Sequence, residues 1–236
     1  MWAIETARAL ETAVRYAAVA ALAFYVLNQV RKPDRWTGRF FLWIMNFSHS
    51  GVTDWGLRHV GIERDFKILD VGCGGGRTIE KLAKLAPDGM VYGIDYADGS
   101  VAASRGKNAK LLKEGRVALQ QASVSQLPFA ENTFDLVTAV ETQYYWPDLL
   151  GDMREILRVL RPGGTLIVIA ESYKKGANEV LQRPVMKLLR STNLSVDEQR
   201  ELFAAAGYNA VEIFEERSKG WICGTADAVE MKPDQK

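Results

Sequence analysis

Short apolar stretches alternate with stretches of helix-forming residues along most of this chain, and that alternation limits the folds open to it. From residue 64 onward, each apolar stretch is five to seven residues long. Such a pattern is typical of βαβ units, in which crossover helices join parallel strands. The segment R-P-G-G at 161–164 should close the last of the helices between these strands. We predict strands over residues 67–71, 90–94, 117–121, 134–140 and 165–170, and helices over residues 78–85, 99–113 and 150–160.

The last third of the chain departs from this pattern. Ser195 and Glu198 form an S-x-x-E capping box, which predicts the start of a helix, and Gly207 should end that helix. Two further apolar stretches, 210–214 and 221–225, are separated only by E-E-R-S-K-G, which fits an antiparallel hairpin. We therefore expect an α/β fold with a seven-stranded, mostly parallel, doubly wound sheet and an antiparallel C-terminal hairpin.

The composition argues against several classes of protein. Charged residues make up 25% of the chain and the formal net charge is +1, so no strong field attracts nucleic acid or an anionic membrane. Cys73 and Cys223 lie far apart and offer neither a metal-binding spacing nor a disulfide framework. We therefore expect a cytoplasmic protein without a bound metal, acting on a small or neutral partner.

An apolar segment near the N-terminus has three interpretations. Residues 16–30 carry no charge, yet these 15 residues are fewer than the roughly 20 that a bilayer-spanning helix needs. Acids precede the segment and no small-residue cleavage site follows it, which argues against a signal peptide. Apolar residues recur every four positions from Leu10 to Val26, as on one face of a helix. We favour a helix that packs on the main domain or, in a homodimer, on a second subunit; membrane contact through residues 13–30 and a flexible extension are the alternatives.

The first predicted strand runs into a glycine loop, I-L-D-V-G-C-G-G-G-R at residues 68–77. A loop of this kind places backbone N–H groups beside a helix N-terminus, which suits an anionic group. The dinucleotide-binding pattern G-x-G-x-x-G fails in both registers, because its last glycine would fall on Arg77 or Ile79. The phosphate-loop pattern also fails, because no Gly-Lys-Ser/Thr follows. The loop therefore predicts an anionic ligand of another kind.

This loop resembles the first motif of class I S-adenosylmethionine-dependent methyltransferases, an acid followed by G-x-G-x-G. The resemblance covers roughly residues 64–228 and implies a Rossmann-like fold, S-adenosylmethionine as methyl donor and S-adenosylhomocysteine as product. It also implies a helical lid, so we expect an N-terminal helical extension at 1–63 and a cofactor-binding domain at 64–236. Further segments resemble the family in the same order: Asp95 at the end of the second strand, Q-A-S-V-S-Q-L-P-F at 121–129, F-D-L-V-T-A-V-E at 134–141 and L-R-V-L-R-P-G-G-T-L at 157–166.

The resemblance also implies the cofactor contacts. The backbone after Gly72 and Gly74 would approach the methionine carboxylate where a Cβ would clash. Asp95 would hold both ribose hydroxyls with its two oxygens. Ser123 stands where the family often has an acid for the adenine amino group; a hydroxyl still accepts a hydrogen bond, and Val124 offers its N–H. The expected cofactor-binding residues are Asp70, Gly72, Cys73, Gly74, Gly76, Asp95, Tyr96, Ser123, Val124 and Glu141.

The methyl acceptor should lie beyond the fourth strand, because ligands of open parallel sheets bind at the carboxyl ends of the strands. Methyl transfer from a sulfonium is an in-line displacement that depends on alignment in a water-poor pocket, so a dedicated catalytic residue is not required. Aromatic rings there either contribute roughly 0.5–2 kcal/mol to holding the sulfonium or belong to the core. The expected substrate-binding residues are Tyr144, Tyr145, Trp146 and His49, and the expected catalytic residues are Glu141, His49 and Tyr145.

Together these features predict an enzyme that moves a methyl group from S-adenosylmethionine to an O, N, S or C atom of a small molecule. Nucleic acid is disfavoured as the acceptor, because the fourth strand ends in E-T-Q-Y instead of the N/D-P-P-Y type used on base amines. Two alternatives stay open. One is a membrane-associated methyltransferase of a lipid-like quinone precursor, and the other is a non-catalytic module that binds S-adenosylmethionine.

Overall fold

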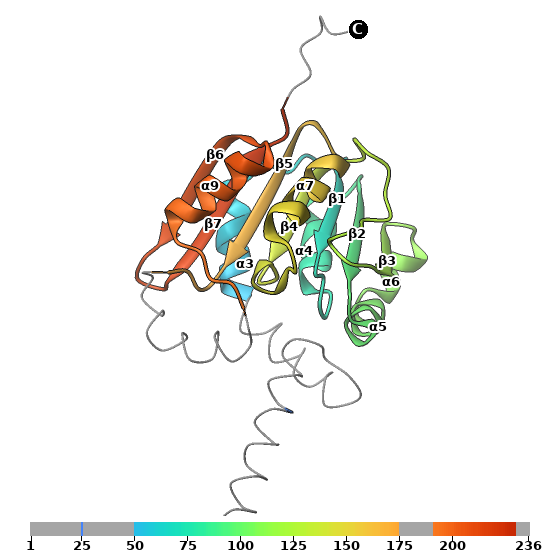
Figure 1. Ribbon diagram of the computed structural model, residues 1–236. Coiled ribbons are helices and arrows are strands. Elements are labelled where there is room, and N and C mark those ends of the chain that lie inside the picture. The colour runs from blue at the N-terminus through green and yellow to red at the C-terminus, as the bar shows by residue number, and fades with distance from the viewer. Residues whose placement is uncertain (1–24, 26–49, 175–190, 230–236) are drawn as a thin grey trace, which may run out of the picture.

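Seven strands form one sheet at the centre of the protein (Figure 1). The computed structural model describes residue 25 and residues 50–174 and 191–229. The strands are β1 (Lys67–Val71), β2 (Met90–Asp95), β3 (Val117–Gln121), β4 (Phe134–Val140), β5 (Leu160–Ala170), β6 (Asn209–Glu216) and β7 (Trp221–Asp227). Their order is β3-β2-β1-β4-β5-β7-β6, and β7 runs antiparallel to both of its neighbours while the other pairs are parallel. The predicted fold class, with its C-terminal hairpin, is confirmed.

Helices cover both faces of the sheet, as a doubly wound fold requires (Figure 1). The helices are α3 (Ser50–Gly56), α4 (Arg77–Leu85), α5 (Asp98–Lys107), α6 (Ala109–Lys113), α7 (Leu149–Val159) and α9 (Val196–Ala206), with 3-10 turns η1 (Leu57–His59) and η2 (Gln143–Tyr145). Met153 of α7 and Phe203 of α9 belong to one apolar core. Val52 of α3 and Ile79 of α4 belong to the other. Each face of the sheet is therefore buried by its own set of helices.

The helix predicted over 99–113 is two helices, α5 and α6, and Asn108 separates them. The Asn108 side chain is buried, and its Nδ2 donates to the carbonyls of Gly76 and Ser104 at 2.9 and 3.0 Å. Gly76 belongs to the glycine loop, so this amide ties the loop to the end of α5. The break exists because a buried polar side chain must find partners, which the helical pattern alone does not show.

The segment R-P-G-G at 161–164 is not a turn that precedes the fifth strand, because β5 already begins at Leu160. Leu160 pairs with Phe134 and Thr165 pairs with Leu136, so five steps along β5 face two steps along β4. The surplus residues form a bulge, and Gly163 adopts a φ of 74° there. Hydrogen bonds between Gly163 or Gly164 and Ala228 close the bulge against the end of β7.

The predicted capping signals of the last helix are confirmed. The Ser195 hydroxyl accepts from the Glu198 N–H, and the Glu198 carboxylate accepts from the Ser195 N–H, at 3.2 and 2.7 Å. Gly207 ends the helix in the left-handed conformation, with φ of 100°. This reciprocal cap fixes the direction in which α9 leaves the carboxyl edge of the sheet.

Helix α3 joins the segment before residue 64 to the sheet. Gly56 lies so close to β5 that an added Cβ would sit 2.9 Å from Cγ2 of Ile169. Lys81 of α4 binds the other end of α3: its ammonium donates to the Ser50 hydroxyl at 3.1 Å and pairs with Asp54. These contacts hold α3 against the sheet and α4.

In the described ranges, no helix is long and apolar enough to cross a membrane. The apolar segment at 13–30 lies outside those ranges, apart from residue 25. The expected roles of that segment, as a lid, a dimer contact or a membrane contact, therefore stay predictions.

Candidate functional site

The glycine loop follows β1 and has a tightly folded backbone. Gly72, Gly74 and Gly76 all have positive φ, at 77°, 48° and 79°. An added Cβ at Gly72 would sit 2.7 Å from Cβ of Thr142, and one at Gly76 would sit 2.8 Å from Cα of Ser104. At Gly72 and Gly76 the glycine is therefore needed for close packing on the protein itself as well as for the backbone conformation.

Most N–H groups of the loop already have acceptors inside the protein. The N–H groups of Gly72 and Cys73 both donate to Ile94 O at 2.8 Å, and the Gly74 N–H donates to Asp95 Oδ2 at 3.0 Å. Helix α4 then begins at Arg77 without a side-chain cap, because its N-cap is Gly76. The first turn of α4, more than the backbone after Gly72, therefore offers donors and a favourable dipole to an anionic group.

Asp70 is buried under the loop, and one of its two carboxylate oxygens accepts a hydrogen bond. Its Oδ1 accepts from the Thr138 hydroxyl at 2.7 Å. Its Oδ2 is buried without a hydrogen-bond partner among the described residues. Burial raises the pKa of Asp70 to about 7, the Thr138 hydroxyl lowers it, and the charge of Asp95 raises it further. A buried acceptor without a donor at this place suits a ligand that brings a donor, above all a cationic one.

Asp95 ends β2 beside the same loop. Its two oxygens accept from the Gly74 N–H at 3.0 Å and the Ala97 N–H at 2.9 Å, which fixes the plane of the carboxylate. Burial raises the pKa of Asp95, while hydrogen bonds from Ala97, Gly74 and Ser100 lower it. Each carboxylate oxygen has a second lone pair, so the group can still accept from a diol.

Tyr96, expected to bind the cofactor, and Ser123 and Val124, expected near the adenine, follow β2 and β3. Tyr96 is exposed, and its carbonyl accepts from Gln121 Nε2 at 2.9 Å. Ser123 Oγ accepts from the Ser125 N–H at 3.2 Å, within a short bridge to Gln126. Val124 is buried in the main core. The structure thus brings Tyr96 to the same edge of the sheet as Asp95.

Glu141 follows β4 and is held in an uncommon backbone conformation. Its φ is 57°, a value that a non-glycine residue rarely adopts. Its N–H donates to Ile169 O at 2.9 Å, and its carboxylate accepts from the Glu171 N–H. Strain of this kind is often found at functional sites, and the next residue, Thr142, packs on Gly72. The structure therefore brings Glu141 next to the glycine loop.

Of the three aromatic rings expected at the acceptor site, two are core residues. The Tyr144 hydroxyl donates to Ser172 O at 3.2 Å and accepts from the Ser172 N–H at 3.1 Å. Burial raises the pKa of Tyr144 well above its usual value. Trp146 is buried in the main core, where its Nε1 has no hydrogen-bond partner among the described residues. Tyr145 is half-buried at an edge-on contact with Tyr144, and His49 lies outside the described residues.

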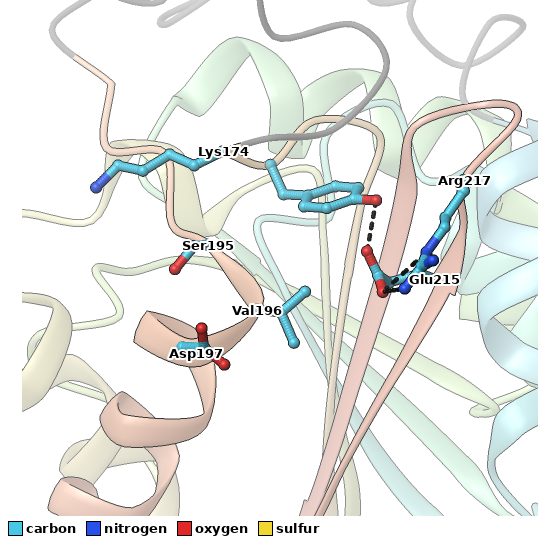
Figure 2. Close-up of a pocket in the computed structure, with 7 residues that line it drawn as sticks. Lys174, Ser195, Val196, Asp197, Glu215 and Arg217 are labelled. Atoms are coloured by element: carbon cyan, nitrogen blue, oxygen red, sulfur yellow. Dashed lines mark hydrogen bonds and ion pairs between the residues drawn. The ribbon is translucent and has the colours of Figure 1, made fainter.

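A cavity of about 390 Å³ opens at the same edge of the sheet, beyond the end of β5 (Figure 2). The motifs of the sequence did not point to it, because its residues come from three separate segments. Two of its residues carried a signal of another kind: Tyr173 follows the fifth strand, and Ser195 belongs to the predicted capping box. The cavity is lined by Tyr173, Lys174, Ser195, Val196, Asp197, Glu215 and Arg217.

Known proteins are similar to this chain in sequence. Residues 69–168 match the family described as "Methyltransferase domain". The chain is 38% identical over 106 residues to the demethylmenaquinone methyltransferase of Symbiobacterium thermophilum, which covers 44% of this chain and 42% of the relative. It is 36% identical over 100 residues to the 27-O-demethylrifamycin SV methyltransferase of Amycolatopsis mediterranei, and this match covers 42% of this chain and 36% of the relative. The match thus spans less than half of the length of either relative.

Solved structures agree on the fold. A S-adenosylmethionine-dependent methyltransferase from Aquifex aeolicus superimposes with a TM-score of 0.62 at 24% identity, over 75% of this chain and 89% of that one. The geranyl diphosphate C-methyltransferase of Streptomyces coelicolor superimposes with a TM-score of 0.66 at 16% identity, over 76% of this chain and 79% of that one. Residues 69–168 therefore match the methyltransferase domain family and the solved structures share the fold, so the resemblance seen in the sequence is confirmed.

Proposed function

We propose that this protein transfers a methyl group from S-adenosylmethionine to an O, N, S or C atom of a small molecule and releases S-adenosylhomocysteine. One observation carries the proposal: the glycine loop, the uncapped start of α4, Asp70 and Asp95 converge at the carboxyl ends of β1 and β2. These groups match the carboxylate, the ammonium and the ribose diol of that cofactor.

Each part of the cofactor has a matching group. The methionine carboxylate would accept from the first turn of α4, where the helix dipole favours an anion. The ammonium would donate to Asp70 Oδ2, which has no donor among the described residues. The ribose hydroxyls would donate to Asp95, whose plane is already fixed by two N–H groups. Tyr96, Ser123 and Val124 would surround the adenine.

On the acceptor side, positioning would supply most of the rate. Glu141 is the candidate proton acceptor, because its backbone and carboxylate are both held at the end of β4 beside the loop. Tyr145, half-buried, is the ring best placed to contact an acceptor, whereas Tyr144 and Trp146 would shape the wall from within the core. His49 stays a candidate base in the proposed lid.

The small-molecule acceptor is supported by relatives whose names specify demethylmenaquinone and 27-O-demethylrifamycin SV. The near-neutral charge of the chain disfavours nucleic acid. We further place the protein in the cytoplasm, with the N-terminal helical extension at 1–63 as a lid or a homodimer contact ahead of the domain at 64–236. Membrane contact through residues 13–30 is the competing assignment.

Calorimetric titration with S-adenosylmethionine tests the proposal. The unmutated protein should bind, and Asp95→Ala should weaken binding tenfold or more. Asp98→Ala is the matched control, because Asp98 is exposed three residues further on, in the first turn of α5. If the unmutated protein does not bind S-adenosylmethionine, the proposal is wrong. A screen of phenols, thiols, amines and carboxylates for S-adenosylhomocysteine release would then identify the acceptor.

A further inference from the structure

The cavity beyond β5 and the proposed methyl-transfer site lie at the same edge of the sheet, at the ends of neighbouring strands. Ala170 of β5 pairs with Ile222 of β7, and Ile222 pairs with Glu215 of β6, so these three residues lie side by side. Glu141 is next to this row, since its N–H donates to Ile169 O. Glu141 and Glu215 are therefore three strand spacings apart, or roughly 14 Å. A single elongated small molecule can therefore contact Glu141 and Glu215 at its two ends.

The walls of the cavity combine an apolar centre with ionic sides. Figure 2 shows Val196 in the middle, with Lys174 and Asp197 on one side and Glu215 and Arg217 on the other. Tyr173 is buried, and its hydroxyl donates to Glu215 Oε1 at 2.7 Å. Burial is the largest cause that raises the pKa of Tyr173 to about 12, so the phenol remains a donor at neutral pH. The Tyr173 hydroxyl therefore holds the Glu215 carboxylate in a fixed place.

The second partner of Glu215 is easy to replace. Arg217 Nη2 lies 3.1 Å from Glu215 Oε2, but the Arg217 side chain is 83% exposed while that of Glu215 is 23% exposed. An exposed arginine can turn into water at little cost, because surface ion pairs contribute about 0–1 kcal/mol. Removal of Arg217 would leave a fixed, largely buried carboxylate that faces the cavity.

The charges around the cavity favour a cation over an anion. Three carboxylates, of Asp197, Glu198 and Glu215, surround two basic groups. Lys174 already binds both oxygens of Glu198, at 2.6 and 2.8 Å. Within the described ranges, Asp197 has no hydrogen-bond or ion-pair partner. An aromatic ring beside a carboxylate is also a favourable environment for an ammonium group.

From this geometry we propose that the cavity binds an ammonium group at the non-reacting end of the methyl acceptor, which takes the place of Arg217 on Glu215. The acceptor is then an elongated amine whose cationic nitrogen lies on the order of 10 Å from the atom that receives the methyl group. This inference rests on the proposed methyl transfer, and it adds a substrate class and a specificity-determining residue, Glu215.

Two probes of equal length test the charge preference: hexylammonium and hexanoate, titrated into the full-length protein saturated with S-adenosylhomocysteine. Hexylammonium should bind in the millimolar range, and hexanoate at least tenfold more weakly. Glu215→Gln should weaken hexylammonium binding about tenfold. Glu216→Gln is the matched control, because Glu216 is the next residue of β6 and bonds the exposed Ser218; it should leave binding within twofold.

Arg217→Ala should change hexylammonium affinity in the opposite direction to Glu215→Gln. It removes the competing cation, so hexylammonium should bind several-fold more tightly, and this exposed residue can be changed without disturbing the core. Stronger binding of hexanoate than of hexylammonium, weaker hexylammonium binding by Arg217→Ala, or no binding of either probe would each overturn the inference. Titration of the same protein with S-adenosylmethionine separates that result from failure of the proposed function, which would show as lost cofactor binding.

Discussion

Asp70 and Thr138 lie side by side on β1 and β4, and the Thr138 hydroxyl donates a 2.7 Å hydrogen bond to Asp70 Oδ1. Burial nevertheless raises the pKa of Asp70 to about 7. The other oxygen, Oδ2, is the one that would face the cofactor ammonium. The protonation of a single buried carboxyl should therefore set how tightly the cofactor binds near neutral pH.

We predict that affinity for S-adenosylmethionine rises roughly tenfold between pH 5.5 and pH 7. Only the ionised form of Asp70 can pair with the ammonium, and the ionised fraction grows steeply as pH approaches the pKa of about 7. Calorimetric titrations across this window measure the trend. Asp70→Asn should bind weakly with no such trend, whereas a wild-type affinity that stays flat with pH would contradict the assignment.

The stability of the protein without cofactor should show the opposite trend. A carboxyl whose pKa is raised on folding stabilises the native state below its unfolded pKa of 3.8, and this contribution is lost as pH rises through about 7. Asp70→Asn should remove this decline, which thermal melting at pH 5, 6, 7 and 8 would show. Saturating cofactor should offset the decline in the unmutated protein, because binding to the native state stabilises it.

Gly72→Ala should cost more than an ordinary glycine replacement at positive φ. At Gly72 the new Cβ would sit 2.7 Å from Cβ of Thr142, in addition to the penalty of a φ of 77°. Gly115→Ala is a matched control, with a φ of 70° and nothing within 4 Å of the new Cβ. We expect a loss of about 1 kcal/mol at Gly115 and of about 3 kcal/mol or more at Gly72, measured by urea unfolding. Equal losses at the two sites would show that packing on Thr142 does not matter.

Asn108→Ala should loosen the glycine loop. The change removes the side-chain donor of the buried Gly76 carbonyl, which still accepts from the Glu80 N–H at 3.3 Å, so folding stability should fall by about 0.5–1.5 kcal/mol. Because Gly76 is the N-cap of α4, cofactor affinity should fall as well. Urea unfolding and calorimetry on the same sample would measure both effects. Loss of stability at unchanged cofactor affinity would separate Asn108 from the cofactor site.

Tyr144→Phe and Tyr145→Phe should affect different properties. The first removes a buried hydroxyl that both donates to and accepts from the Ser172 backbone, so stability should fall by about 1–3 kcal/mol. The second keeps the half-buried ring but removes the hydroxyl of Tyr145, an expected catalytic residue at the proposed acceptor site, so kcat/KM should fall severalfold at nearly unchanged stability. Once an acceptor is known, a rate screen and thermal melting compare the two variants. The reverse pattern would assign Tyr144 to the acceptor and Tyr145 to the core.

The strands were predicted closely from the sequence because their apolar runs are short and bounded. The predicted ranges 67–71, 117–121 and 134–140 are those of β1, β3 and β4. The errors occurred where a tertiary contact decides the local structure. Asn108 breaks a helix to reach Gly76, and the bulge at 161–164 is held by Ala228, far away in the sequence.

In the candidate site, too, features set by local sequence were predictable and features set by tertiary contacts were not. That the residues expected to bind the cofactor lie together was predictable, because one loop carries most of them and Asp95 ends the adjacent strand. The burial of each aromatic residue after β4 was not predictable, because ring identity alone does not reveal that Tyr144 bonds Ser172 while Tyr145 stays half-exposed. Tyr173 and Glu215 are 42 residues apart in the sequence, and no spacing rule connects them.

The antiparallel direction of β7 has a practical consequence for the experiments proposed above. Ala228 is held against Gly163 and Gly164 at the amino ends of the parallel strands, so Val229 leaves the described domain on the side opposite the glycine loop (Figure 1). A surface linker fused directly after Val229 would therefore start away from both the cofactor loop and the cavity. Immobilisation through a linker at that position would leave the cofactor loop and the cavity open to ligand in binding assays.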